Sequence, residues 1–222
     1  MSTMGGSYTL VLTCRCCAQD LSDVLLPLLG TAARNLGLEE LLAEVVLCVD
    51  DLPADDAGWL RIDSVAERTR PRLTLYCGCA ALTACSPGGP PAGTEAYVWE
   101  LTAPEPTAVE AADLDEGTAL AFLHHQLLLA RDLLRRELEP QVVPAGLTET
   151  FAAVWDVTLD GRLDREGLPG YTLETRRARF SNLFSSASVL MPHHWQIFQS
   201  LWEGGLVSQS DVLAAVRQLP RL

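Results

Sequence analysis

The sequence predicts an α+β fold, with a small mixed β-sheet in the N-terminal half followed by an all-helical C-terminal half. Short apolar runs of strand length recur before residue 103, and apolar residues follow helical spacing after residue 116. Only one helix is expected among the strands, which argues against a series of βαβ units. With 222 residues, we expect a single domain over 1–222, with a strand-rich portion at 1–103 and a helical portion at 116–222.

Five strands and one helix are expected in the first half. Ser7–Cys14 alternates apolar and polar residues, as a strand with one buried face does. A helix then runs to about Leu36 and ends at Gly37. Val45–Val49 is a short, continuous apolar run, which is typical of a central strand. The other expected strands are centred on Leu60 and Ile62, on Arg72–Cys77 and on Tyr97–Leu101.

Helices account for the second half. Their apolar residues recur at three- and four-residue spacing, and prolines, glycines and capping residues separate them. One of them carries a basic face. The predicted helices are Glu116–Leu138, Thr148–Leu163, Leu173–Phe184 (with Arg176, Arg177 and Arg179), Pro192–Trp202 and Ser208–Leu219.

Charge and composition exclude several functions. The net charge of −13 argues against nucleic acid as a partner and against binding to anionic membrane surfaces. All 16 basic residues are arginine. Schiff-base enzymes, pyridoxal phosphate enzymes, P-loop nucleotidases and protein kinases each require a lysine, so none of these mechanisms fits the chain.

No apolar run reaches the roughly 18 residues that a membrane span needs. Nothing basic precedes the first apolar run, so a signal peptide is not expected. We therefore expect a cytoplasmic protein whose seven cysteines are reduced thiols.

A histidine pair on the helix Glu116–Leu138 carries the clearest functional signal. In the His-Glu-x-x-His motif, two histidines four residues apart bind one zinc ion, and the glutamate activates a water molecule. Counting from His125, Gln126 stands at the general-base position and Leu129 at the second histidine position. Gln126 has the shape of glutamate but cannot accept a proton at neutral pH, so no catalytic residue is assigned.

Over residues 7–163 the chain resembles a zincin-type metallopeptidase with a degenerate motif. That family has a small mixed sheet whose edge strand shortly precedes the active helix, and a second helix that often supplies an acidic ligand. The resemblance implies that Tyr97–Leu101 is the edge strand and that zinc is the metal, if any cofactor is bound. The implied ligand set is His125, His124, Glu149, Asp156 and Asp160.

The predicted function is that of a catalytically inactive zincin-like domain, which acts as a binding or scaffold module for a protein or peptide. An extended peptide would bind by β-augmentation in a cleft between the edge strand and the His125 helix. Two alternatives remain open. One is a metal-dependent hydrolase whose non-standard ligand set also includes His193, and the other is a helical interaction module with an acidic surface or exposed Trp99, Trp195 and Trp202. A hydrogen-bonded structural role for the histidine pair is the simplest reading.

Cysteines and a second histidine pair offer two further candidate sites. Cysteines follow two of the expected strands, and a thiolate cluster would form if those strands were neighbours, although Cys-x-Cys spacing is less diagnostic than Cys-x₂-Cys. Packing as small hydrophobic residues is the alternative. His193 and His194 would join His124 or His125 around a metal, or would simply lie in the first turn of a helix. The cluster comprises Cys14, Cys16, Cys17, Cys77 and Cys79, with Cys85 nearby.

Overall fold

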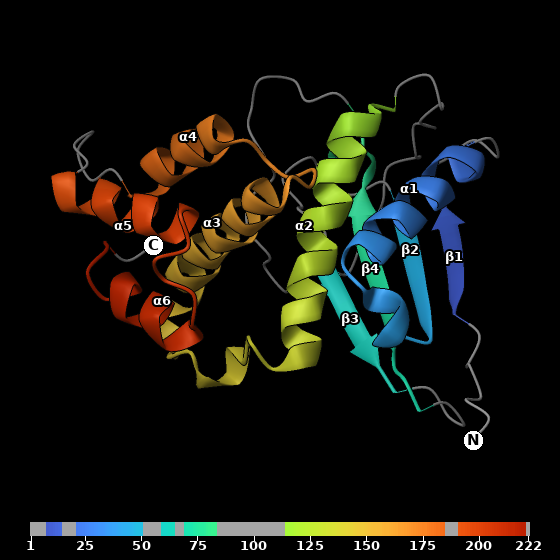
Figure 1. Ribbon diagram of the computed structural model, residues 1–222, viewed down its shortest axis with the longest axis horizontal. Helices are drawn as coiled ribbons and strands as arrows, with labels where there is room; N and C mark the ends of the chain where they lie inside the picture. Colours follow the sequence, from blue (N-terminus) through green and yellow to red (C-terminus); the bar gives the residue numbers. More distant parts are fainter. Residues whose placement is uncertain are drawn as a thin grey trace, which may run out of the picture.

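The computed structural model describes residues 8–14, 21–50, 59–64, 69–83, 114–184 and 191–220. A four-stranded sheet with one helix forms the N-terminal part, and an all-helical part follows it, so the predicted α+β class is confirmed (Figure 1). The elements of the N-terminal part are β1 (Thr9–Cys14), α1 (Leu21–Asn35), β2 (Glu44–Asp50), β3 (Trp59–Asp63) and β4 (Arg72–Gly78).

The sheet is mixed, as predicted, and its strand order is β1-β2-β4-β3. β1 pairs with β2, and β2 pairs with β4, both in parallel. β3 pairs with β4 in the antiparallel direction, with Leu60 opposite Leu75. Within the described part of the chain β3 is therefore an edge strand. The expected strand Tyr97–Leu101 lies outside the described residues.

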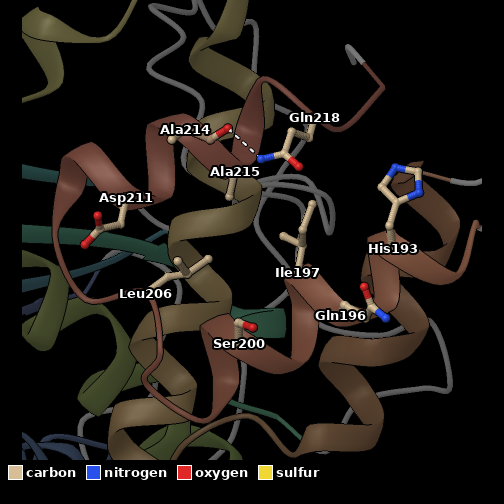
Figure 2. A pocket seen from close by; sticks show the side chains of 9 residues that line it. All are labelled: His193, Gln196, Ile197, Ser200, Leu206, Asp211, Ala214, Ala215 and Gln218. Atoms are coloured by element: carbon tan, nitrogen blue, oxygen red, sulfur yellow. Dashed lines mark hydrogen bonds between the residues drawn. The ribbon is translucent and has the colours of Figure 1, made fainter.

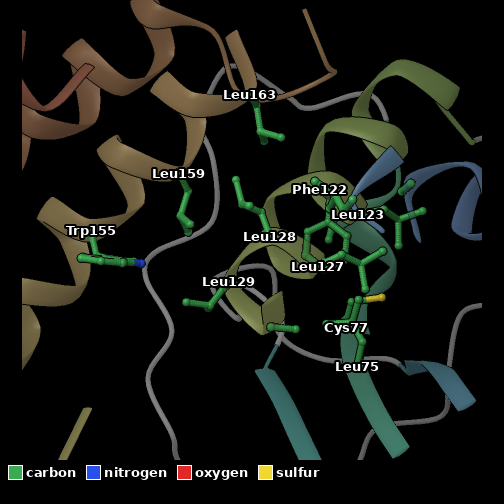
Figure 3. Packing of buried hydrophobic residues seen from close by; sticks show 14 of the residues in the cluster. Leu75, Cys77, Phe122, Leu123, Leu127, Leu128, Leu129, Trp155, Leu159 and Leu163 are labelled. Carbon is green, nitrogen blue, oxygen red and sulfur yellow. The ribbon is translucent and has the colours of Figure 1, made fainter. Parts of the chain in front are cut away.

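One face of the sheet is buried under α1 and α2 (Glu116–Arg135), which pack against each other (Figure 1). On β2, Val45, Leu47 and Val49 are buried while Val46 and Cys48 between them are not, because alternate residues of a strand point to opposite faces. Figure 3 shows the side chains of this core where α2 meets β4.

α2 buries two of its faces. Leu123 and Leu127 pack toward Leu75 and Cys77 of β4, while Leu128 and Leu129 lie toward the next helix of the chain (Figure 3). The helix ends three residues before the expected Leu138, because Arg136 adopts the left-handed conformation (φ 58°) as its C-cap. α2 thus joins the sheet to the helical part.

Four helices complete the fold. α6 begins with the predicted cap: the side chain of Ser208 and that of Asp211 bind each other's backbone N–H groups as a capping box. None of the helices in the described ranges is both long and apolar enough to cross a membrane. The four are α3 (Thr148–Glu166), α4 (Leu173–Phe184), α5 (Pro192–Trp202) and α6 (Gln209–Val216).

α3 is the centre of the helical part, since it packs against α2, α4, α5 and α6. Helices on several sides bury an unbroken run of its residues, 154–161, including Asp156 and Asp160. A buried carboxylate is costly unless it is paired. The position of α3 therefore requires partners for both acids, and these partners define the candidate site.

Candidate functional site

His125 of α2 lies between two carboxylates of α3. Its Nδ1 is 3.1 Å from Asp160 Oδ1, and its Nε2 is 3.4 Å from Asp156 Oδ1. Asp156 and Asp160 are four residues apart and so share one face of α3. All three side chains are buried. The helix–helix contact thus brings together the histidine and two of the acids that the sequence nominated.

Arg176 of α4 is the fourth member of this network, and it was not predicted. Its Nε donates to Asp160 Oδ2, and its Nη1 lies 3.7 Å from Asp156 Oδ2. The guanidinium also packs on the ring of Tyr171, 4.8 Å from the ring centroid. The chain therefore supplies a cation of its own between the two carboxylates.

The pKa values of the network reflect its ion pairs, in which His125 and Arg176 each contact both Asp156 and Asp160. Burial alone would lower the pKa of His125, but the Asp160 and Asp156 carboxylates outweigh it and raise that pKa, against the opposing effect of Arg176. Burial alone would raise the pKa of Asp156, but His125 and Arg176 lower it. Burial also disfavours the charged form of Arg176, yet both carboxylates raise its pKa. These directions favour the charged forms of all three side chains. Arg176 Nη2 also lies 3.2 Å from His125 Nδ1, so the guanidinium contacts the histidine ring as well as the two carboxylates.

Two residues of the predicted ligand set lie elsewhere. His124 points away from α3: its Nδ1 donates to the carbonyl oxygen of Leu120 at 2.8 Å, and its Nε2 accepts from Asn35 of α1 at 3.1 Å. Burial lowers the pKa of His124, which favours this neutral form. Glu149 is exposed in the first turn of α3, about two helical turns from Asp156.

Within the described ranges, no three His, Cys, Asp or Glu side chains form a group that could hold a metal ion. Among the predicted ligands, Asp156 and Asp160 are already paired with Arg176, which is a physical reason why they do not form a metal site. A guanidinium that binds both carboxylates already provides the positive charge that these acids need.

Gln126, at the general-base position of the degenerate motif, is buried and takes no part in the network. Its Oε1 meets no hydrogen-bond donor among the described residues. Gln126, Leu129 and Leu133 follow i, i+3, i+7 spacing and so share a face of α2. A buried amide oxygen without a donor is a cost to the fold, which makes Gln126 a residue that needs an explanation.

An apolar pocket of about 240 Å³ opens beside the network, between β3, α2 and α3. Most of its lining is aliphatic or aromatic, and the carboxylate-bearing residue Asp156 is at its wall. The pocket therefore extends from the edge strand β3 to Asp156, a member of the buried network. Its lining residues are Trp59, Leu60, Leu129, Leu133, Leu138, Pro140, Val143, Thr148, Phe151, Ala152, Trp155 and Asp156.

The aromatic residues of this pocket are held in place by their neighbours. Trp59 stacks on Tyr76, its partner on β4, with ring centroids 3.8 Å apart. Trp155 donates its indole N–H to Asp132 Oδ2 at 3.2 Å, and Asp132 is in turn bound by Arg162. A pocket whose walls are fixed in advance loses little conformational entropy when a ligand binds.

A second pocket of about 330 Å³ lies between α5 and α6. Figure 2 shows that its lining includes His193 and Gln196 of α5, Asp211 and Ala214 of α6, and Gln218 just after α6. The expected joint site of two histidine pairs does not form, because His125 contacts α3 and α4 while His193 lines this pocket. His194 packs against the His193 ring, with centroids 4.0 Å apart.

Only part of the predicted thiolate cluster is described. Cys77 is buried in the hydrophobic core beside α2 (Figure 3). Cys79, which directly follows β4, is half-buried. Cys16, Cys17, Cys85 and the side chain of Cys14 lie outside the described residues.

Comparisons with protein-family models, with curated proteins and with solved structures find no match to this chain.

Proposed function

We propose that this chain is a non-catalytic binding module, built on a zincin-like plan, that holds an extended segment of a partner protein against β3. The observation that carries the proposal is the apolar pocket between the edge strand β3 and the helices α2 and α3. The order of elements agrees with the resemblance found in the sequence: a mixed sheet, then the histidine helix, then a helix with buried acids.

The edge strand supplies the backbone part of the binding site. In the described part of the chain, β3 pairs with β4 on one side and with nothing on the other. An edge strand offers unpaired N–H and C=O groups, and an extended peptide satisfies them by adding a strand. This mode of binding requires no particular peptide sequence, so it provides affinity rather than specificity.

The pocket supplies the side-chain part. Trp59 and Leu60 belong to β3 itself, so a peptide paired with this strand passes directly over the pocket. Alternate side chains of that peptide point to the face of the sheet that α2 covers. The volume of about 240 Å³ suits one large apolar side chain rather than a whole small molecule such as a dinucleotide.

Three features argue against peptide hydrolysis at this groove. Gln126 cannot act as a general base, and Leu129 lines the pocket as an apolar side chain where the motif requires a histidine. The third is Arg176, which binds the acids that the hydrolase alternative would assign to a metal. Binding without catalysis is the function that these residues favour.

The test uses seven-residue peptides, acetylated and amidated, in which a central position flanked by threonine and serine carries leucine, phenylalanine, tyrosine or alanine. We expect the three large residues to bind and to shift the NMR signals of the β3 backbone amides and of the Trp155 indole. Alanine at the centre, or N-methylation of the peptide bonds that face β3, is expected to weaken binding at least tenfold.

Two matched variants locate the site. Ala152→Phe fills the pocket and is expected to abolish binding, whereas Ala214→Phe makes the same change in the pocket between α5 and α6 and is expected to leave binding unchanged. If Ala214→Phe is the variant that blocks binding, the helical-module alternative is correct. If no peptide binds at millimolar concentration, the proposal is wrong.

A further inference from the structure

We infer that Asp132, a buried residue of α2, makes the pocket selective for a hydrocarbon side chain such as phenylalanine or leucine, because it binds the indole N–H that Trp155 would otherwise offer to a ligand. This inference rests on the proposed function and adds the class of side chain that the groove accepts. Three observations carry it: the hydrogen-bond partner of Trp155, the contacts that fix Asp132, and the partners of the other polar side chains of the lining.

Trp155 lines the pocket and is only 4% exposed. Its Nε1–H group donates to Asp132 Oδ2 at 3.2 Å, and Asp132 is not among the described residues that line the pocket. A buried indole N–H needs an acceptor, and here the chain supplies one. Trp155 therefore contributes ring surface to the pocket rather than a hydrogen-bond donor.

Asp132 is itself held in place by its neighbours. Arg162 donates to both of its carboxylate oxygens, with Nη1 at 3.0 Å from Oδ1 and Nη2 bound to Oδ2. A bidentate contact of this kind fixes the orientation of the carboxylate. The backbone carbonyl oxygen of Asp132 accepts the N–H of Glu137 at 2.9 Å and that of Leu138, another lining residue, at 3.3 Å. One residue outside the lining thus positions two parts of the pocket wall.

The other polar side chains of the lining also have partners outside it. Asp156 Oδ1 pairs with His125, and Oδ2 pairs with Arg176. The Thr148 hydroxyl donates to a backbone carbonyl oxygen at 3.2 Å. Trp59, which is 37% exposed, belongs to the solvent-accessible edge of the pocket. Among the described residues, the buried lining therefore offers hydrocarbon surface, and a hydroxyl placed against it would lose water without gaining a partner.

The experiment uses the unmodified protein and the seven-residue peptides, with phenylalanine, 4-methylphenylalanine or tyrosine at the centre, in isothermal titration calorimetry. The methyl group of 4-methylphenylalanine has about the size of the tyrosine hydroxyl but forms no hydrogen bond, so it is the matched control. We expect tyrosine to bind about fivefold more weakly than 4-methylphenylalanine, which corresponds to about 1 kcal/mol. The factor is modest because an apolar pocket does not strongly reject an added hydroxyl. Tyrosine is still expected to bind more tightly than alanine, since its ring is buried.

Three variants test the role of Asp132. Asp132→Leu leaves the indole N–H without its acceptor, which a tyrosine hydroxyl can replace, so we expect the fivefold ratio to fall to about one. Asp132→Asn retains a carbonyl oxygen for the N–H and is expected to keep the ratio. The NMR signal of the Trp155 indole proton is expected to move in Asp132→Leu and to stay in Asp132→Asn. Glu137→Gln is the control, because it removes a charge 3.8 Å from Arg162 and leaves the Asp132–Trp155 hydrogen bond in place.

Each outcome bears on the inference. Equal or tighter binding of tyrosine relative to 4-methylphenylalanine leaves the groove in place but overturns the selection. Binding of both that is equally weak relative to phenylalanine shows that the pocket reads length rather than polarity, which also overturns it. An unchanged ratio in Asp132→Leu, or its loss in Asp132→Asn, overturns the role of Asp132. Failure of every peptide to bind removes the groove and the inference together. Because the first comparison uses no variant, the folding of Asp132→Leu does not affect it.

Discussion

Arg176 of α4 and Asp160 of α3 form a buried ion pair, and the same Asp160 carboxylate also accepts the backbone N–H of Tyr171 and faces His125. The two side chains of the pair are 3% and 0% exposed. Three helices thus meet at one acid. The pair ties α4 to α3, on which one wall of the apolar pocket is built.

The first prediction concerns this pair. Arg176→Met keeps much of the apolar length but leaves Asp160 and Asp156 without their guanidinium partner. Loss of one member of a buried ion pair costs about 3–5 kcal/mol. We expect the free energy of unfolding in urea to fall by that amount. Arg177→Met, one residue along on the exposed side of α4, is the control and is expected to change stability by less than about 0.5 kcal/mol. Equal effects of the two variants would show that the pair contributes nothing.

The sequence identified three members of this network and missed the fourth, for a physical reason. Asp156 and Asp160 stand out because acids among apolar residues of a helix require a partner. The helical spacing of α4 indicates a basic face but does not reveal that Arg176 is buried while Arg177 is exposed. Two buried carboxylates next to one histidine need a second positive charge. That requirement is the signal in the sequence that could have identified an arginine such as Arg176 as the missing partner.

A strand bordering a cleft was predicted at Tyr97–Leu101, which lies outside the described residues, so it stays a prediction. In the described part of the chain, β3, which follows its apolar pattern at Leu60 and Ile62, borders the apolar pocket. The pattern of a strand indicates which face is buried but not which strand is its neighbour. The antiparallel pairing of β3 on the outer side of β4 arises only in the assembled sheet.

The second prediction contrasts two adjacent histidines. His124 and His125 differ by one position, yet burial lowers the pKa of His124 while two carboxylates raise that of His125. In an NMR titration of ring protons, we expect His125 to titrate above the ordinary value of about 6.5 and His124 below it. Asp160→Asn is expected to lower the His125 value and to leave His124 unchanged. The reverse order of the two histidines would contradict the network as described.

The third prediction is a dependence of stability on pH. A raised folded-state pKa means that His125 stabilises the fold fully below the unfolded value of about 6.5, and that this stabilisation is lost as pH rises through the folded value. Asp156, whose folded pKa is lowered, stabilises above the unfolded value of about 3.9, and this is lost as pH falls through the folded value. His124, buried and neutral, opposes folding as pH falls below about 6.5.

Urea unfolding at a series of pH values measures this dependence. We expect the unfolding free energy of the unmodified protein to fall from pH 6 to pH 8, and His125→Gln to lack that fall. His124→Gln serves as the neighbouring control, and is expected to keep the loss above pH 6 while losing part of the sensitivity to acid. A stability that rises steadily from pH 6 to pH 8 would show that His125 is neutral in the folded protein.

The fourth prediction concerns metal content. Because Arg176 binds Asp156 and Asp160, we expect elemental analysis of the protein purified without chelator to find zinc and iron well below one ion per chain. Near-stoichiometric metal would instead favour the hydrolase alternative. Comparison of His125→Ala with Cys77→Ala would then assign the metal to the helix pair or to the cysteines.

The fifth prediction tests the contact that holds α3 against α5. A Cβ atom added at Gly161 would lie 2.5 Å from the carbonyl oxygen of Trp202 and 2.9 Å from its Cα, so the two helices would have to move apart. Overpacking of this kind costs about 1–3 kcal/mol, although alanine favours a helix over glycine by about 1 kcal/mol. We expect Gly161→Ala to lower the unfolding free energy and to weaken binding at the groove, because Trp155 and Asp156 belong to the same helix. Gly146→Ala, where no atom lies within 4 Å of the added Cβ, is expected to leave both measurements unchanged. An equal or greater stability of Gly161→Ala would show that α3 and α5 are not packed as closely as the structure has them.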